Sequence, residues 1–92
     1  MRNPAIIIQT ATQTVGHDTT LDRLDPGEVG LILDVDTSRP LGRRLLDMGI
    51  TPGLRTKVVR RAPLGDPIEI SMPDTLVSLR SYEAALVSVR AI

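Results

Sequence analysis

The chain has 92 residues, with eleven basic and eleven acidic side chains and so no net charge, and it contains no cysteine, tryptophan or phenylalanine. This length allows one domain with a thin core built from leucine, isoleucine, valine and methionine. The composition excludes disulfides and thiolate metal sites, and it argues against a dedicated nucleic-acid binder, which would need net positive charge and exposed aromatic rings.

Residues 1–19 are rich in threonine and glutamine and show no sustained period. Their one apolar run, Ala5 to Ile8, is too short for a signal-peptide core or a membrane span. We therefore expect a flexible N-terminal tail over 1–19, in which Ile6 to Ile8 can form a short added strand. The folded domain should cover 20–92 in a soluble, cytoplasmic chain that meets a membrane only through a partner.

The domain should open with one helical turn that buries Leu21 and Leu24, followed by a turn at Pro26 and Gly27. The next stretch, 28–36, alternates between apolar and polar residues and indicates a half-buried strand. The pattern predicts four inward-facing side chains: Val29, Leu31, Leu33 and Val35. Gly30 within this strand indicates a bulge or a close backbone approach.

A helix of about two turns is predicted from Pro40 to Met48, with Thr37 or Ser38 as its cap. Its apolar stripe should cover one end of the sheet and consists of Leu41, Leu45 and Met48, with Leu46 alongside. Gly49 should end the helix in the left-handed conformation, with Ile50 folding back on the last turn, and Pro52-Gly53 should form a type II turn.

The remainder of the chain predicts strands over 54–61, 68–72, 75–79 and 87–92. A loop at 62–67 and a hairpin turn at Pro73-Asp74 join the first three, and Ser81 should cap one helical turn that carries Glu83. About five short strands joined by tight turns indicate a mainly β protein, a small antiparallel barrel with one inserted helix and a short helical turn near each end.

Candidates for catalysis or ligand binding are scarce. His17 is the only histidine, and its place in the tail favours a solvated side chain over a general base or metal ligand. The acidic residues from Asp18 to Asp36 favour a solvated edge over a cation site, and neither glycine-rich stretch matches a phosphate loop. We therefore expect no enzyme activity, no catalytic residue, no cofactor and no metal ligand.

Charge is distributed unevenly along the chain. Asp18 to Asp36 holds six acidic residues and one basic residue, whereas Arg39 to Arg61 holds seven basic residues and one acidic residue. Two interpretations are compatible: the segments become neighbours and partly neutralise each other, or they form a polarised surface that orients a protein partner. A recognition helix for DNA is improbable, because the helix at 40–48 is short and lacks a preceding partner helix.

Four ordered stretches, LDRLDPGEVGLILDV, LGRRLLDMGITPG, VVRRAPLGDPIEISM and LVSLRSYEAALVSVRAI, resemble the FeoA family from about Leu21 to Ile92. Twelve motif residues should be mainly structural: Leu21, Leu24, Gly27, Leu45, Met48, Gly49, Pro52, Gly53, Leu79, Arg80, Glu83 and Ala84. Met48 stands where leucine is more usual, and the tail is longer than the family's usual start.

The resemblance implies an SH3-like β-barrel that works by binding. Its partner would be the cytoplasmic GTPase domain of a FeoB-type ferrous iron permease, which the chain would regulate or scaffold; a stand-alone module of an iron- or manganese-responsive transcription regulator is the alternative. The expected partner surface joins the basic residues to the loop and comprises Arg43, Arg44, Arg60, Arg61, Pro63, Leu64, Gly65, Asp66 and Pro67. An exposed edge strand could also pair with a second copy.

Overall fold

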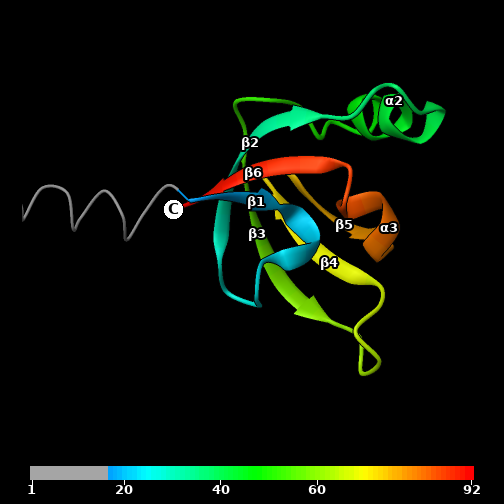
Figure 1. Ribbon diagram of the computed structural model, residues 1–92. Helices are drawn as coiled ribbons and strands as arrows, with labels where there is room; N and C mark the ends of the chain where they lie inside the picture. The colour runs from blue at the N-terminus through cyan, green and yellow to red at the C-terminus, as the bar shows by residue number, and fades with distance from the viewer. Residues whose placement is uncertain (1–16) are drawn as a thin grey trace, which may run out of the picture.

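The computed structural model describes residues 17–92, which form one antiparallel sheet, two short helices and a 3₁₀ turn (Figure 1). The elements are β1 (Asp18–Thr20), η1 (Leu21–Arg23), β2 (Val29–Val35), α2 (Pro40–Asp47), β3 (Arg55–Arg61), β4 (Ile68–Met72), β5 (Thr75–Leu79), α3 (Ser81–Ala84) and β6 (Val87–Ala91). The strands lie in the order β1-β6-β2-β3-β4-β5, so β1 and β5 are the two edges.

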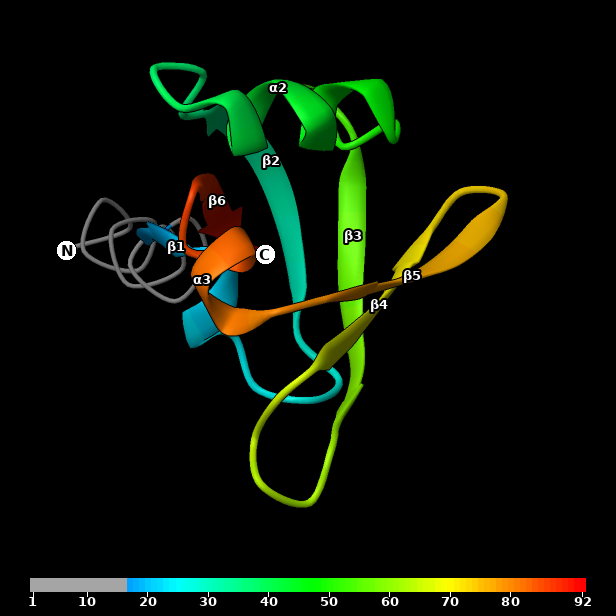
Figure 2. The ribbon, with the colours of Figure 1, turned by 90° about the vertical axis from the view of Figure 1, so that its right-hand side faces the viewer.

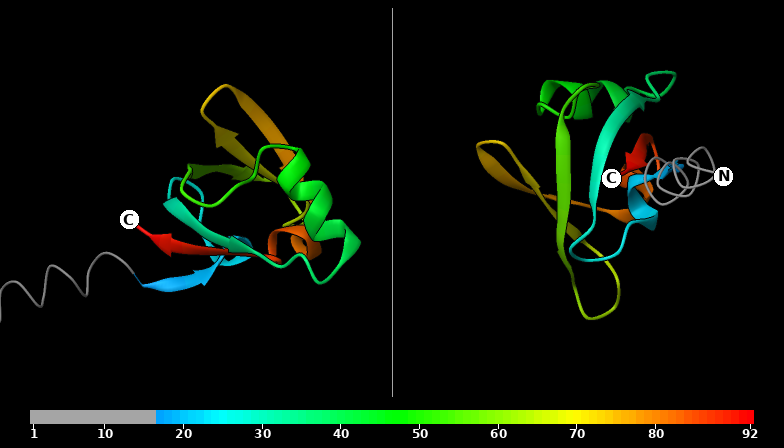
Figure 3. Two further views of the ribbon diagram at one scale, coloured as in Figure 1. Left: turned by 90° about the horizontal axis from the view of Figure 1, so that it is seen from above. Right: turned by 90° about the vertical axis from the view of Figure 1, so that its left-hand side faces the viewer.

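The sheet curls strongly around its core, as the view from above shows (Figure 3). The expected mainly β, small antiparallel architecture is confirmed, but the sheet has six strands, and no ladder joins β1 to β5 among residues 17–92. The additional strand is β1, which pairs with β6 and crosses the expected boundary between residues 19 and 20. The strand expected at Ile6 to Ile8 lies outside the described residues.

The core is aliphatic, as the composition requires. The 3₁₀ turn buries Leu21 and Leu24 beneath the sheet, as expected, and β4 points Ile68, Ile70 and Met72 inward. Thr56 is the one buried polar residue in the described part, and its hydroxyl donates to the Ser71 carbonyl at 3.1 Å. The core therefore contains no charged group and offers no buried chemistry.

The predicted inward face of β2 is wrong for three of its four residues. Gly30, Ile32 and Val35 are buried, whereas three residues are only half-buried: Val29, Leu31 and Leu33. A bulge between Ile32 and Asp34 reverses the alternation within the strand, so a simple two-residue period misassigns it. Gly30 is the predicted close approach, since a Cβ there would lie 2.9 Å from Leu24 Cδ1.

Helix α2 ends as predicted. Gly49 has a φ of 96°, its N–H donates to the Leu46 carbonyl at 2.9 Å, and the Ile50 N–H donates to the Leu45 carbonyl at 3.1 Å. These two bonds form a Schellman motif, and its hydrophobic contact consists of Leu45 and Ile50, both fully buried. The turns at Gly27 and Gly53 also use positive φ, and each is closed by a bond from the residue after the glycine.

Two details of α2 differ from expectation. Met48 is 44% exposed, because it lies at the end of the helix where the chain reverses and Ile50 takes the buried position. Neither Thr37 nor Ser38 caps the helix, since Arg39 is the capping position and makes no side-chain bond there. The Asp36 carboxylate accepts instead from the Ser38 hydroxyl, at 2.6 Å, and this bond lowers the pKa of Asp36.

Candidate functional site

The expected partner surface divides into two separate regions. Helix α2, with Arg43 and Arg44 exposed, lies at one end of β3, and the 62–67 loop lies at the other (Figure 2). Strand β3 has seven residues, so the two regions are separated by about 23 Å at ~3.3 Å per residue. The structure therefore does not bring Arg43 and Arg44 together with Pro63 to Pro67, although both regions remain available to a partner.

The 62–67 loop is a tight turn that presents one apolar side chain to solvent. The Gly65 N–H donates to the Ala62 carbonyl at 2.7 Å, and the Ala62 N–H donates to the Pro67 carbonyl at 3.0 Å. Proline at the second position and glycine at the fourth are the residues that a type I turn favours, and the φ of 88° at Gly65 is one that glycine adopts without strain. At its tip, Leu64 is 96% exposed. The turn therefore holds this leucine in one exposed position, and contact with a partner remains a prediction.

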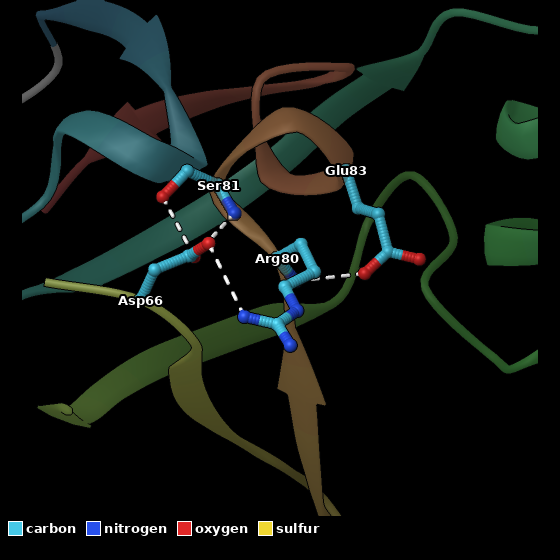
Figure 4. A network of polar contacts seen from close by, with 4 residues as sticks. All are labelled: Asp66, Arg80, Ser81 and Glu83. Atoms are coloured by element: carbon cyan, nitrogen blue, oxygen red, sulfur yellow. Dashed lines mark hydrogen bonds and ion pairs between the residues drawn. The ribbon is translucent and has the colours of Figure 1, made fainter.

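Asp66 anchors the loop to the start of α3 (Figure 4). Its Oδ1 accepts from the Ser81 N–H at 2.7 Å and from the Ser81 hydroxyl at 2.9 Å, and its Oδ2 lies 3.6 Å from Arg80 Nη1. The hydroxyl bond, supported by the N–H bond and the charge of Arg80, holds the pKa of Asp66 below its usual value. Glu83 completes the junction, because its carboxylate accepts from the Arg80 N–H at 2.7 Å.

The sequence identified Arg80 and Glu83 only as motif residues, and the role that it predicted for Ser81 is wrong. Ser81 was expected to cap α3, but Arg80 is the capping position, and the Ser81 hydroxyl donates across the chain to Asp66. Asp66 and Ser81 are 15 positions apart, so no local sequence pattern predicts their hydrogen bond. The motif residues Leu79 and Ala84 are buried beside this junction.

A shallow pocket of about 120 Å³ lies at the base of the loop. Six residues line it: Arg60, Ala62, Pro63, Pro67, Glu69 and Ser78. Small-molecule sites usually enclose about 300–1,000 Å³, so this pocket fits part of a protein partner better than a cofactor. No sequence pattern predicted that Glu69 and Ser78 belong to this site, because only the register of β3, β4 and β5 places them beside Arg60.

Arg60 and Arg61, which are adjacent in β3, make different contacts. Arg60 is largely exposed and forms an ion pair with Glu69 on the neighbouring strand, with Nε 3.0 Å from Oε1. Arg61 is half-buried and its guanidinium donates to the backbone carbonyls of Asp22 and Leu24, which fastens η1 to the sheet. The bulge between Val58 and Arg60 changes the alternation of β3 at this point. Partner contact remains a prediction for both residues.

The acidic and basic segments are neighbours in the sheet, since Val29 pairs with Lys57 and Leu31 with Arg55. Direct neutralisation between them is not observed: the ion pairs of residues 17–92 join Arg60 to Glu69, Arg80 to Asp66 and Arg90 to Asp18. The bond from Arg90 lowers the pKa of Asp18. Most of the basic segment therefore keeps its charge available to a partner.

Within the described part of the chain, no group of three or more histidine, cysteine, aspartate or glutamate side chains could hold a metal ion. None of its helices is long and apolar enough to cross a membrane.

Comparison with known proteins assigns the domain. The model of the FeoA domain family matches residues 19–91. A curated relative, the Fe(2+) transport protein A/Fe(2+) transporter FeoB fusion protein of Porphyromonas gingivalis, is 36% identical over 72 residues, which are 78% of this chain and 8% of the relative. The chain thus spans about a twelfth of that relative's length.

Solved structures agree on the architecture. The FeoA protein from Chlorobium tepidum superposes with a TM-score of 0.73 at 35% identity, over 80% of this chain and 70% of that one. Stenotrophomonas maltophilia FeoA, solved with zinc and described as a prokaryotic SH3 domain, gives 0.68 at 27% identity, over 77% and 88%. A manganese-dependent transcriptional repressor shares the fold alone, with a TM-score of 0.74 at 21% identity over 82% of this chain and 41% of that one.

Proposed function

The chain belongs to the FeoA family, and on that premise we propose that it is a cytoplasmic protein-interaction module that regulates or scaffolds a FeoB-type ferrous iron permease and has no catalysis of its own. The observation that carries the proposal is the Porphyromonas gingivalis relative, in which a transport protein A segment and the FeoB transporter form one polypeptide. Fusion holds two domains at high effective concentration, and separate chains that work together must bind instead.

We assign the contact with the permease to the end of the sheet formed by Arg60 and the 62–67 loop. Leu64 supplies an exposed apolar anchor, the shallow pocket beside it can accept a partner side chain, and Asp66 fixes the loop in place. A side chain that is already held in place loses little conformational freedom on binding, and a few residues usually carry most of the energy of an interface. Arg43 and Arg44, at the far end of β3, would contact a second part of a large partner.

A binding assay against the soluble GTPase domain of the cognate permease tests this proposal. We expect Leu64→Ser to weaken binding about tenfold or more, because it removes the exposed anchor without disturbing a buried contact. Ile92→Ser is the matched control, since Ile92 is also an exposed aliphatic residue but follows β6 and belongs to neither proposed contact region. Wild-type protein that fails to bind in the apo, GDP and GTP-analogue states of that domain would refute the proposal.

The alternative, a module of a metal-responsive transcription regulator, is supported by fold likeness alone. Calorimetric titration of the full chain with Mn(II) and Fe(II) separates the two ideas. Tight stoichiometric binding, together with no affinity for the permease domain, would favour the regulator.

A further inference from the structure

Strand β5 is one edge of the sheet that residues 17–92 form. It pairs with β4 on one side, and no strand of the described residues pairs with it on the other (Figure 2). Its five residues, Thr75 to Leu79, include no charged side chain and no proline, and Leu76 is 57% exposed. Proteins usually protect an edge with charge, proline, a bulge or a covering element, because its free backbone groups recruit another strand. The other edge, β1, has only three residues and carries Asp18.

The register shows which backbone groups of β5 do not bond to β4. Met72 and Thr75 face each other across the two-residue hairpin turn, and Ile70 faces Val77. Hydrogen-bonded and non-bonded pairs alternate in an antiparallel ladder, so Thr75, Val77 and Leu79 bond to β4. The N–H and carbonyl groups of Leu76 and Ser78 then point outward, where they can bond to an added strand. The Leu76 carbonyl also accepts from the Thr75 hydroxyl at 3.3 Å, and its second lone pair can accept a further bond.

Side chains on the outer surface of the sheet define what an added strand would carry. Cross-strand neighbours lie on the same face of the sheet. One row across β3, β4 and β5 consists of Lys57, Ser71 and Leu76 and ends at an exposed leucine. The next row consists of Arg60, Glu69 and Ser78 and ends at the shallow pocket. A residue opposite Ser78 would lie nearer to the Glu69 carboxylate than to Arg60, which is one strand further away. A basic side chain fits that position, and an aliphatic one fits the position opposite Leu76.

We propose that β5 accepts an antiparallel strand from a partner protein, with lysine or arginine opposite Ser78, an aliphatic residue opposite Val77 and another opposite Leu76. The backbone bonds at Leu76 and Ser78 would supply affinity, and the side chains above Leu76 and beside Glu69 would supply selectivity. The β5 edge does not include the Leu64 anchor, but it shares the shallow pocket with the proposed permease contact. The inference does not depend on the permease as partner.

A partner strand fits this edge better than a second copy of β5. Two antiparallel copies related by a twofold axis at Val77 would place Leu76 opposite Ser78 twice, with a polar hydroxyl against each exposed leucine. An axis at Leu76 would pair the two leucines but would place the acidic Asp74 opposite Ser78, on the side of Glu69. Neither dimer would bring a new cation to Glu69. Self-pairing is therefore one of the alternatives that the experiment must detect.

The test uses the full ¹⁵N-labelled chain and a capped peptide with the central order lysine–valine–leucine between threonines. We expect the amide resonances of Leu76 and Ser78 to shift and to gain protection from hydrogen exchange. Ser78→Pro should weaken binding about tenfold, because it removes an outward N–H and leaves the bonds to β4 intact. Ser78→Thr is the matched control, since it keeps the N–H and the hydroxyl.

Leu76→Lys provides a second variant if Ser78→Pro perturbs the spectrum of the folded domain. It leaves every backbone group in place, adds charge to the edge and should also weaken binding of the peptide. Shifts that map to another surface, or equal binding by wild type and both variants, would overturn the proposal. A dimer in sedimentation analysis that Ser78→Pro dissociates would overturn it in favour of a second copy.

Discussion

At the scale of single residues, some packing roles cannot be predicted from the residue type alone. Gly42 is the clearest case: the start of α2 packs so closely against the preceding loop that a Cβ at this position would lie 1.8 Å from the Asp36 carbonyl oxygen. No local turn or positive φ marks this glycine, so its role depends entirely on how α2 meets the end of β2.

We expect Gly42→Ala to destabilise the protein by about 1–3 kcal/mol, the usual cost of forcing extra atoms into a packed site. This sign opposes intrinsic helix propensity, which favours alanine over glycine by about 1 kcal/mol in a helix. Urea denaturation monitored by circular dichroism measures the difference. Arg43→Ala, one residue further on the exposed side of α2, should change stability by less than about 0.5 kcal/mol. A stabilising Gly42→Ala would show that the contact relaxes freely.

Two neighbouring arginines provide a matched comparison. Arg61→Met leaves the carbonyls of Asp22 and Leu24 without their donor, and we expect it to cost about 1–3 kcal/mol of unfolding free energy. Arg60→Met removes only an exposed ion pair with Glu69 and should cost about 0–1 kcal/mol. Equal losses in urea melts of the two variants would contradict the assignment of Arg61 as the residue that fastens η1.

At the scale of elements, the sequence predicted every segment of the described residues except β1, and it predicted where the chain turns. It did not predict which side chains of each strand face the core. The C-terminal end of α2 and the turns at Gly27 and Gly53 were predictable because positive φ and proline geometry are local properties. The inward face of β2 was not, because aliphatic residues occupy both of its faces and a bulge reverses the alternation. The junction of the 62–67 loop with α3 was not predictable either, because its hydrogen bonds join residues 15 positions apart.

That junction should make stability depend on pH through Asp66. Its folded-state pKa is lowered by the bonds from Ser81, so its contribution is complete above the unfolded value of about 3.9 and is lost as the pH falls through the lower folded-state pKa. Asp66→Asn should reduce the difference between urea midpoints at pH 7 and pH 3. Asp18 and Asp36, whose pKa values are also lowered, should preserve the rest of that difference. An unchanged difference would show that Asp66 titrates normally.

At the scale of the whole molecule, the eleven basic and eleven acidic side chains give no net charge. Most of those in residues 17–92 nevertheless form no ion pair with one another. The ion pairs among residues 17–92 are exposed, and none joins the acidic segment to the basic segment that follows it. The aliphatic core, rather than charge, therefore accounts for the stability of the described domain.

We expect the unfolding free energy to change by less than about 1 kcal/mol between 0.05 and 0.5 M NaCl, since exposed pairs contribute little and are screened. Urea melts at both salt concentrations measure this change. A loss of more than about 2 kcal/mol would indicate that the acidic and basic segments attract each other strongly in the folded state. Binding to the permease domain, in contrast, should weaken with salt if Arg60 contributes to the contact.

The sequence alone determined the family, the aliphatic core and the mainly β class, because ordered motifs, turn residues and composition are local information. It also selected the 62–67 loop as the candidate contact point. Only the tertiary structure decided that the basic helix and this loop lie at opposite ends of β3, that Arg61 faces the backbone of η1, and that β5 is an open edge. These properties depend on strand order, register and bulges, which arise from contacts between residues far apart in the chain.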